Sequence, residues 1–381
     1  MLDFSPSNFV AAIVDHLFVT APSESVVYGN TIPAFNGSAT VSGMPSGGIT
    51  SASFGCANTS GSVPPRNVGF YAVTCTGPAE VSPAGSPANI GVSYIPGGLT
   101  ITQRPLTIAA VINTRLYDGT ISASAIPMAS VGTPLSGVGL VNGDTITAAE
   151  TYNNRNAGSG KTLSVSAYVV MDQNNGGNYA PITLTTVSTG VITQRPLSIK
   201  ALTNTKTYDG TISASAIPTV VAATSTTGLV STDTVTGLAE TYDTRNAGVG
   251  KTLSVSAYTV NDGNNGGNYA PVTKITNTTG VINQRSLTIT AQPNTKIYDG
   301  TTSARAIPIV SAATSTTGLV LPDTVTGLAE TYNTASIGSG KTLTVSSYTI
   351  NDGNSGKNYA VTKVANNNGV ITDRDGDFDN E

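Results

Sequence analysis

Tyr117-Asp118-Gly119 is a triplet that returns as Tyr208-Asp209-Gly210 and again as Tyr298-Asp299-Gly300, at steps of 91 and 90 residues. Three other phrases keep the same step: Glu-Thr-Tyr at 150–152, 240–242 and 330–332, Gly-Lys-Thr-Leu from 160, 250 and 340, and Asn-Tyr-Ala from 178, 268 and 358. A unit of this length exceeds a solenoid repeat and suits an independent β-sandwich domain. The repetition therefore predicts three tandem domains.

The landmarks divide the chain into six segments. They are an apolar N-terminal segment (1–19), a divergent β module (20–105), repeat 1 (106–195), repeat 2 (196–285), repeat 3 (286–373) and an acidic tail (374–381). Gln-Arg-Pro or Gln-Arg-Ser links the modules without a flexible spacer. Because proline fixes φ and biases the preceding residue to an extended conformation, we expect a stiff string.

Within each repeat the residue pattern is that of short strands. Between Lys161 and Val170, Leu163 and Val165 alternate with serine and threonine, and helix signals are nearly absent. We predict an all-β fold of tandem immunoglobulin-like β-sandwich modules in an elongated rod. Each module should have six to eight strands and form a closed unit.

The first 19 residues follow a different pattern. Ser5-Pro6 is a typical helix start, and Phe9, Ile13 and Leu17 follow at helical spacing, which predicts a short amphipathic helix. Its apolar face would dock on a neighbouring subunit or pack on the first sandwich, and a disordered end of the chain is the remaining alternative.

The composition excludes several classes of function. Only 10% of the 381 residues are charged and the net charge is −4, so no cationic surface would collect nucleic acid. No run of apolar residues is long enough to span a membrane. Cys56 and Cys75, the two cysteines, are expected to form a disulfide that staples the divergent module, although reduced buried thiols are the alternative.

The motifs that resemble catalytic or phosphate sites have simpler explanations. Asp118, Asp209 and Asp299, read with Glu150, Glu240 and Glu330, could be acid–base pairs, but three copies favour a structural role. Asp before Gly builds a tight turn, and the preceding tyrosine would anchor that turn on the core. Gly-Ser-Gly-Lys at 158–161 lacks the earlier glycine of a phosphate loop, and an alternating strand follows it. His16 is the single histidine, so histidine chemistry is unavailable to the repeats. We predict no enzyme activity and no cofactor.

Two weaker hypotheses concern ligands and cross-links. The alternating carboxylates Asp373, Asp375, Asp377 and Asp379 could bind calcium, with a solvated acidic end as the alternative. Lys161, Asn178 and Glu150 recur together and could form an isopeptide bond, although surface roles are the simpler interpretation.

The Tyr-Asp-Gly-Thr repeat, with its Gly-Lys-Thr-Leu and Gly-Asn-Tyr phrases, resembles the bacterial YDG module. Val27-Tyr28-Gly29 of the divergent module resembles the related mostly-β glycine-rich (MBG) module. The resemblance implies a place in a filamentous-haemagglutinin-like adhesin on the bacterial surface, without catalytic residues or a defined ligand. Repeat 3 departs from the pattern at Ala335-Ser336-Ile337, where the other repeats have Arg-Asn-Ala, which fits a different neighbour.

Together these features predict an extracellular structural stalk or adhesin repeat region. The alternatives are a self-assembling filament subunit with head-to-tail or strand-addition contacts, and a module that binds glycan or protein. The expected partners are other copies of the chain, further modules of a longer chain, or a host or surface glycan or protein.

Overall fold

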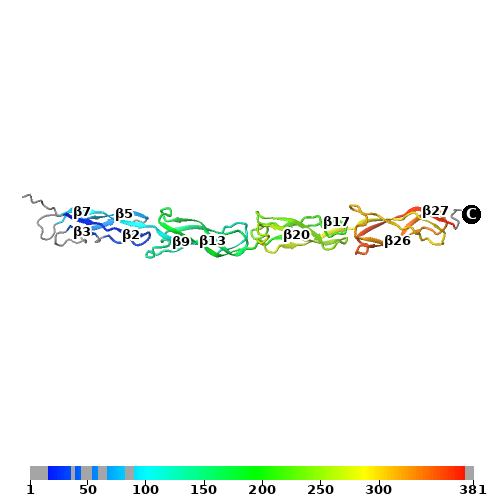
Figure 1. Ribbon diagram of the computed structural model, residues 1–381, viewed down its shortest axis with the longest axis horizontal. Coiled ribbons are helices and arrows are strands. Elements are labelled where there is room, and N and C mark those ends of the chain that lie inside the picture. The colour runs from blue at the N-terminus through cyan, green and yellow to red at the C-terminus, as the bar shows by residue number, and fades with distance from the viewer. Residues whose placement is uncertain (1–15, 36–38, 44–53, 59–66, 82–89, 374–381) are drawn as a thin grey trace, which may run out of the picture. The chain divides into compact units, whose positions relative to one another are not determined.

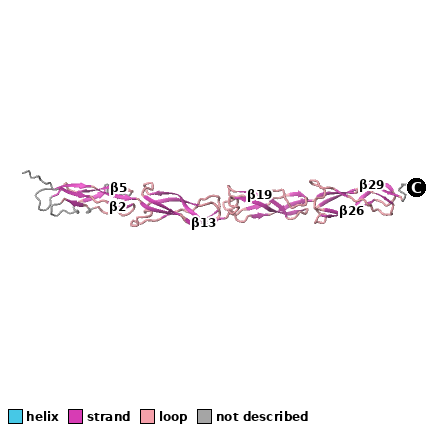
Figure 2. Cartoon of the chain, viewed as in Figure 1, coloured by secondary structure: helices cyan, strands magenta, loops and turns pink. Residues whose placement is uncertain are grey.

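The computed structural model describes residues 16–35, 39–43, 54–58, 67–81 and 90–373. Within these ranges every regular element is a strand, so the all-β prediction is confirmed (Figure 2). In the same ranges no helix has the length and apolar character that crossing a bilayer requires.

The helix predicted near the N-terminus falls largely outside the described residues. Leu17, its last apolar position, lies in strand β1 (His16–Thr20) and is fully buried. The prediction is wrong for that part of the segment, because the backbone of β1 pairs in parallel with β7 (Ile90–Ile95). Residues 16–19 therefore belong to the N-terminal module.

The chain divides into two compact units, one of residues 1–115 and 120–192 and the other of 116–119 and 193–381. The first unit holds the N-terminal module and most of repeat 1. The second holds repeats 2 and 3 together with the motif residues around Tyr117. Figure 1 follows the strands along the chain by colour.

Each repeat has seven strands in two sheets, one of four strands and one of three. In repeat 3 the four-stranded sheet has the order β24-β29-β27-β26 and the three-stranded sheet the order β25-β23-β28. The bounds are β23 (Arg285–Thr290), β24 (Thr295–Ile297), β25 (Ile309–Val310), β26 (Thr324–Tyr332), β27 (Gly338–Asn351), β28 (Tyr359–Val364) and β29 (Asn366–Thr372). Repeated two-sheet units confirm the sandwich-like class.

Repeats 1 and 2 have the same strand order as repeat 3. In repeat 1 the strands are β9 (Arg104–Ala109), β10 (Thr114–Leu116), β11 (Met128–Ala129), β12 (Thr145–Tyr152), β13 (Gly158–Met171), β14 (Tyr179–Thr185) and β15 (Val187–Thr193). In repeat 2 they are β16 (Ser198–Lys200), β17 (Thr205–Thr207), β18 (Thr219–Val220), β19 (Thr234–Tyr242), β20 (Gly248–Asn261), β21 (Thr273–Ile275) and β22 (Asn277–Asn283).

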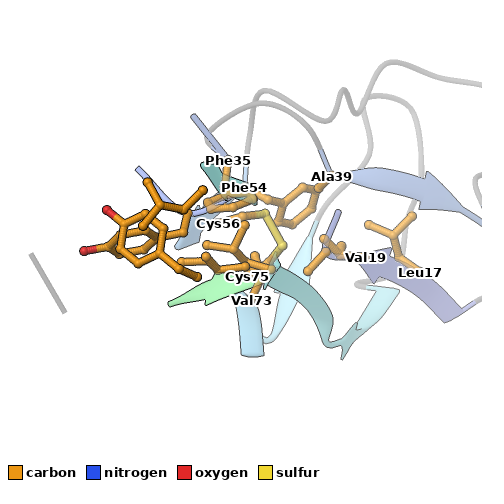
Figure 3. Packing of buried hydrophobic residues seen from close by; sticks show 14 of the residues in the cluster. Leu17, Val19, Phe35, Ala39, Phe54, Cys56, Val73 and Cys75 are labelled. Atoms are coloured by element: carbon orange, nitrogen blue, oxygen red, sulfur yellow. A yellow bond between two sulfur atoms is a disulfide. The ribbon is translucent and has the colours of Figure 1, made fainter. Parts of the chain in front are cut away.

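The N-terminal module pairs its described strands in two four-stranded sheets, β3-β1-β7-β6 and β2-β8-β5-β4. The remaining bounds are β2 (Glu24–Val27), β3 (Thr40–Ser42), β4 (Gly55–Asn58), β5 (Gly69–Thr76), β6 (Glu80–Val81) and β8 (Gly97–Thr102). Cys56 and Cys75 face each other across β4 and β5 and form a disulfide within the apolar core (Figure 3).

The alternation of buried and exposed side chains explains why these segments form sandwiches. Leu287 and Ile289 of β23 are fully buried, whereas Ser286 is exposed and Thr288 and Thr290 are half-buried. This is the period of two that a half-buried strand requires. The prediction of closed units, however, is wrong within the second compact unit. One apolar cluster contains Tyr208 of repeat 2 and Leu287, Ile350 and Tyr359 of repeat 3. The core of repeat 2 therefore continues into repeat 3.

Candidate functional site: a repeated domain joint

The motif tyrosine of repeat 2 contacts the following repeat. We call the set of contacts between two successive modules a joint. Tyr208 follows β17 and is fully buried, and its backbone N–H donates to the Asn283 carbonyl at 2.9 Å. Its hydroxyl donates to Asp323 Oδ2 at 2.9 Å. The sequence predicts that this tyrosine anchors its turn on the core, and Tyr208 does lie in an apolar core cluster. What the sequence did not predict is that an aspartate of repeat 3 holds the polar end of the side chain.

A second tyrosine, from repeat 3, donates to the same aspartate. Tyr359 Oη donates to the same Asp323 Oδ2 at 2.8 Å, and its ring meets that of Tyr208 edge to face with centroids 5.5 Å apart. Edge-to-face pairs of this kind stabilise beyond the area they bury. Burial and the hydrogen bond to Asp323 raise the pKa of Tyr208 to about 12, so its hydroxyl stays a donor at physiological pH.

The arginine of the Gln-Arg-Ser link fills the other side of the joint. Arg285 begins β23, is 2% exposed, and donates through Nη1 to the Tyr208 carbonyl at 3.2 Å. Its remaining partners are the carbonyls of one loop of repeat 3: Thr314, Ser315, Thr317 and Gly318 at 2.6–3.4 Å. The planar fork of guanidinium donors suits such a ring of acceptors, whereas an ammonium group offers only three donors. This link lacks the proline that the other two links carry, so its stiffness depends on the hydrogen bonds of its arginine.

The Arg-Asn-Ala phrase of repeat 2 adds further hydrogen bonds to repeat 3 at the edge of the joint. Arg245 Nη2 donates to Asp323 Oδ1 at 3.2 Å and to the Asp352 carbonyl at 3.0 Å. The Ala247 N–H donates to Asn358 Oδ1 at 2.8 Å, and Asn358 Nδ2 donates to Asn246 Oδ1 at 3.4 Å. Asp323 thus receives donors on both carboxylate oxygens, which is how a buried charge is retained.

A buried aspartate shapes the loop that presents Asn358. Asp352 accepts the backbone N–H groups of Asn354, Gly356 and Asn358 at 2.8–3.1 Å. Burial raises the pKa of Asp352, but these backbone donors outweigh it and hold the pKa below its ordinary value. The loop places Ser355 and Gly356 at positive φ, a conformation that glycine adopts without strain.

The same joint recurs in the first compact unit, although the N-terminal module diverges in sequence. Tyr28 and Tyr179 donate to Asp144 Oδ2 at 3.0 and 2.6 Å, and Arg104 Nη1 donates to the Tyr28 carbonyl at 2.9 Å. The Val68 N–H donates to Asn178 Oδ1 at 2.9 Å. The arrangement thus depends on a few positions and tolerates a different module around them.

Tyr117 of repeat 1 makes equivalent contacts inside the second compact unit. Its hydroxyl and that of Tyr269 donate to Asp233 Oδ2 at 3.0 and 2.8 Å, and Arg195 Nη1 donates to the Tyr117 carbonyl at 3.3 Å. We call the arginine, the aspartate and the second tyrosine the acceptor site. The three acceptor sites are Arg104, Asp144 and Tyr179; Arg195, Asp233 and Tyr269; and Arg285, Asp323 and Tyr359.

The aspartate and glycine of the motif triplets form local turns, as the sequence predicts. Gly119, Gly210 and Gly300 have φ values of 82°, 79° and 75°. Asp209 Oδ1 accepts the Thr211 N–H at 2.9 Å and the Lys206 ammonium at 2.8 Å. In Asp299 the hydrogen bonds from Lys296 and Thr301 lower the pKa to about 2.

The glutamates considered for acid–base chemistry are buried within single repeats. Glu240 Oε2 accepts the Leu202 N–H at 2.8 Å, beside a bulge between Ala239 and Glu240 that shifts the strand register. Glu240 Oε1 is buried and has no hydrogen-bond partner among the described residues, and burial raises the pKa of this carboxyl. Glu150 and Glu330 repeat the arrangement, with one backbone bond and one unpaired oxygen among the described residues.

The structure also tests the phosphate-loop phrase and the isopeptide trio. Gly158-Ser159-Gly160-Lys161 opens the long strand β13, so the prediction that a strand follows this phrase is confirmed. Lys161 Nζ donates to Asn154 Oδ1 at 2.6 Å, whereas Asn178 lies in the joint and Glu150 bonds the Val111 N–H. The isopeptide trio is therefore not assembled.

Of the carboxylates proposed for calcium, only Asp373 lies within the described part of the chain, and Asp375, Asp377 and Asp379 lie outside it. In the described part, no three acidic, histidine or cysteine side chains gather in a way that could hold a metal ion.

Comparison with known proteins identifies the repeats. The sequence model of the YDG domain matches residues 102–188, 193–277 and 283–366. A search of the curated proteins found no match. Among solved structures, the chain is similar to the crystal structure of Drosophila N-cadherin EC1-4, with 7% sequence identity and a TM-score of 0.21 over 93% of this chain and 99% of that one. The score is too low to support an argument.

Proposed function

Because this chain belongs to the YDG-domain family, we propose that its three tandem domains and N-terminal module serve as a structural stalk. The stalk would belong to an extracellular bacterial surface protein of the adhesin type and would have no catalytic role. Its function would be mechanical, since the modules would hold another part of the protein at a distance.

The repeated joint is the observation that carries the proposal. A tandem array linked by flexible spacers would bend at each link. Here Tyr208 and Arg285 close the link with hydrogen bonds from side chains that are at most 2% exposed. Burial excludes competing water, so each bond resists bending more strongly than a surface contact would.

The surface and the cysteine pair support the extracellular setting. Disulfides such as Cys56–Cys75 persist in oxidising compartments and are rare in the cytosol. Only 10% of the residues are charged, which limits electrostatic repulsion between successive modules. The resemblance of Val27-Tyr28-Gly29 to the MBG module, together with Tyr28 in the same role as Tyr208, supports a shared joint chemistry across both module types.

Small-angle scattering from the whole chain tests the stalk. We expect the skewed distance distribution of an elongated particle, and a symmetric distribution typical of a globule would contradict the proposal. A Tyr208→Ala, Arg285→Ala double variant should broaden the distribution by loosening one joint. Tyr298→Ala is the matched control and should leave it unchanged, because Tyr298 is half exposed and contacts no following repeat in the described chain.

A self-assembling filament is the second candidate, and the exposure of Tyr298 favours it because a surface used elsewhere for joints is open there. Electron micrographs over a range of protein concentrations separate the two candidates. Isolated particles at every concentration support the stalk, whereas uniform fibres that lengthen with concentration support the filament.

A further inference from the structure

We propose that the end of repeat 3 that carries Tyr298, Gly300 and Ile337 is a docking surface for one further YDG-type domain. We call these three residues the terminal face. The inference rests on the proposed function as a stalk, which gives such docking a purpose. The contacts that it would make are inferred from the geometry of the three joints.

The motif tyrosine shows that the terminal face is half of a joint. Tyr28, Tyr117 and Tyr208 are 7%, 0% and 0% exposed, whereas Tyr298 is 50% exposed. In the described part of the chain the Tyr298 hydroxyl has no hydrogen-bond partner, while each of the other three donates to an aspartate. Tyr298 therefore presents a hydroxyl donor and an apolar ring, and within the described residues it lacks the aspartate acceptor that the other three motif tyrosines have.

The motif glycine gives an independent observation. A methyl group placed on Gly29 would lie 2.3 Å from Val141, and one on Gly210 would lie 3.4 Å from the Leu321 carbonyl and 3.7 Å from Val320. Each of these neighbours belongs to the following domain. A methyl group on Gly300 would meet no described atom within 4 Å. The space that a following domain fills in two joints is open at the terminal face.

The backbone of the terminal face already has the docked geometry. The Tyr298 N–H donates to the Thr372 carbonyl at 2.8 Å, as the Tyr208 N–H does to Asn283 at 2.9 Å. Strand β24 pairs in parallel with β29 in the same register as β17 with β22. A partner would therefore bind a surface that needs little reordering, which favours association.

The residues at the edge of the terminal face indicate which side chains the partner should present. Ala335-Ser336-Ile337 replaces Arg245-Asn246-Ala247, so the cation that pairs with Asp323 in the joint between repeats 2 and 3 is absent. Ser336 instead contacts Thr334 and Lys341, and Ile337 is 44% exposed. The occupant should keep the acceptor aspartate, tyrosine and arginine for Tyr298, and present an apolar side chain opposite Ile337.

A second copy of this chain does not offer such a surface in its described residues. The acceptor sites of repeats 1, 2 and 3 already hold Tyr28, Tyr117 and Tyr208. Docking of another copy would require one of these joints to open. A YDG-type domain with an empty acceptor site is therefore the occupant that the observations favour.

The experiment extends the whole chain by one domain. A copy of residues 284–373, with phenylalanine in place of its own Tyr298, is placed directly after Thr372. The new link then has the Gln-Arg-Ser sequence found between repeats 2 and 3, and the tyrosine and the segment that are measured belong to the original repeat 3 alone. Nitration of tyrosine and amide hydrogen exchange over residues 295–301 are then compared between the natural and the extended chains. We expect Tyr298 to be nitrated in the natural chain and protected in the extended one, with at least tenfold slower exchange of the segment.

Variants of the extended chain distinguish docking from a nonspecific effect. Tyr298→Ala should restore fast exchange, whereas Ile307→Ala should not, because Ile307 and its counterparts Ile126 and Ile217 are all 65–69% exposed and lie outside the joints. Changing Ala335-Ser336-Ile337 to Arg-Asn-Ala should increase the protection further, because the added copy carries Asp323. Unchanged nitration and exchange in the extended chain would overturn the inference. The stalk proposal would survive that result, since scattering from the natural chain tests it separately.

Discussion

Tyr208 and Asp323 belong to different repeats, yet the tyrosine hydroxyl donates to the aspartate carboxylate at 2.9 Å and both side chains are at most 2% exposed. A hydrogen bond to a buried charge is worth more than a neutral one, commonly about 1.5–3 kcal/mol. Because the bond crosses from one repeat to the next, its loss should weaken the joint while the two sheets of each repeat stay folded.

Tyr208→Phe should therefore destabilise the joint by about 1–3 kcal/mol. Asp323 keeps Tyr359 and Arg245 as donors, so the loss should not exceed this range. Amide hydrogen exchange of the Asp323 segment measures the effect locally. Tyr298→Phe is the matched control and should change stability by less than about 0.5 kcal/mol. Equal effects of the two substitutions would show that the Tyr208 hydroxyl contributes nothing to the joint.

The pH dependence of the joint has a definite sign. Burial and the hydrogen bond to Asp323 raise the pKa of Tyr208 from 10.0 to about 12, so the neutral hydroxyl is the form that the fold favours. Its contribution is fully present below pH 10 and is lost as the pH rises from 10 through 12, to the extent of about 3 kcal/mol. Tyr359 and Tyr269 shift in the same direction for the same main cause, burial.

Denaturant unfolding between pH 8 and 12 measures this loss, and an ultraviolet titration identifies the tyrosinate. Tyr208→Phe isolates the single group, because the variant should lose less stability across this range than the wild type. A variant curve parallel to that of the wild type would assign the alkaline loss to other tyrosines.

Much of the fold, and only part of the joint, could be predicted from sequence. The step near 90 residues and the alternation in segments such as 161–170 indicate sandwich domains, and Asp-Gly is a turn signal at any position. These signals are local or periodic. The contact between Tyr208 and Asp323 gives no such signal, because Asp323 lies 115 positions away and only the fold brings the two residues together. The repetition of Arg104, Arg195 and Arg285 in the links was the available clue to a buried role.

Arg285→Lys tests the role of the link arginine. One ammonium group cannot replace the set of guanidinium bonds to five carbonyl oxygens, so several buried acceptors would lose their donors. We expect a loss of about 3 kcal/mol or more and faster proteolysis near residues 314–318. Arg305→Lys is the control, since Arg305 is exposed in the same repeat and should have a near-neutral effect. A tolerated Arg285→Lys would indicate that the carbonyls are satisfied in another way.

The disulfide of the N-terminal module gives the last prediction. Cys56 and Cys75 are 19 positions apart, and closing a loop of this length reduces the entropy of the unfolded chain enough to stabilise the fold by about 3 kcal/mol. The bond lies in the core of the N-terminal module, between β4 and β5, and no strand of repeats 2 or 3 contacts that pair in the described chain (Figure 3). Reduction, or a Cys56→Ser, Cys75→Ser variant, should therefore lower the melting transition of this module and leave that of repeats 2 and 3 in place. Calorimetry of the whole chain with and without reductant separates the transitions, and Ser25→Ala, on strand β2 of the same sheet, serves as the mutational control. If reduction lowered all transitions together, the N-terminal module would have to be folding cooperatively with the repeats, and the staple would stabilise the entire chain.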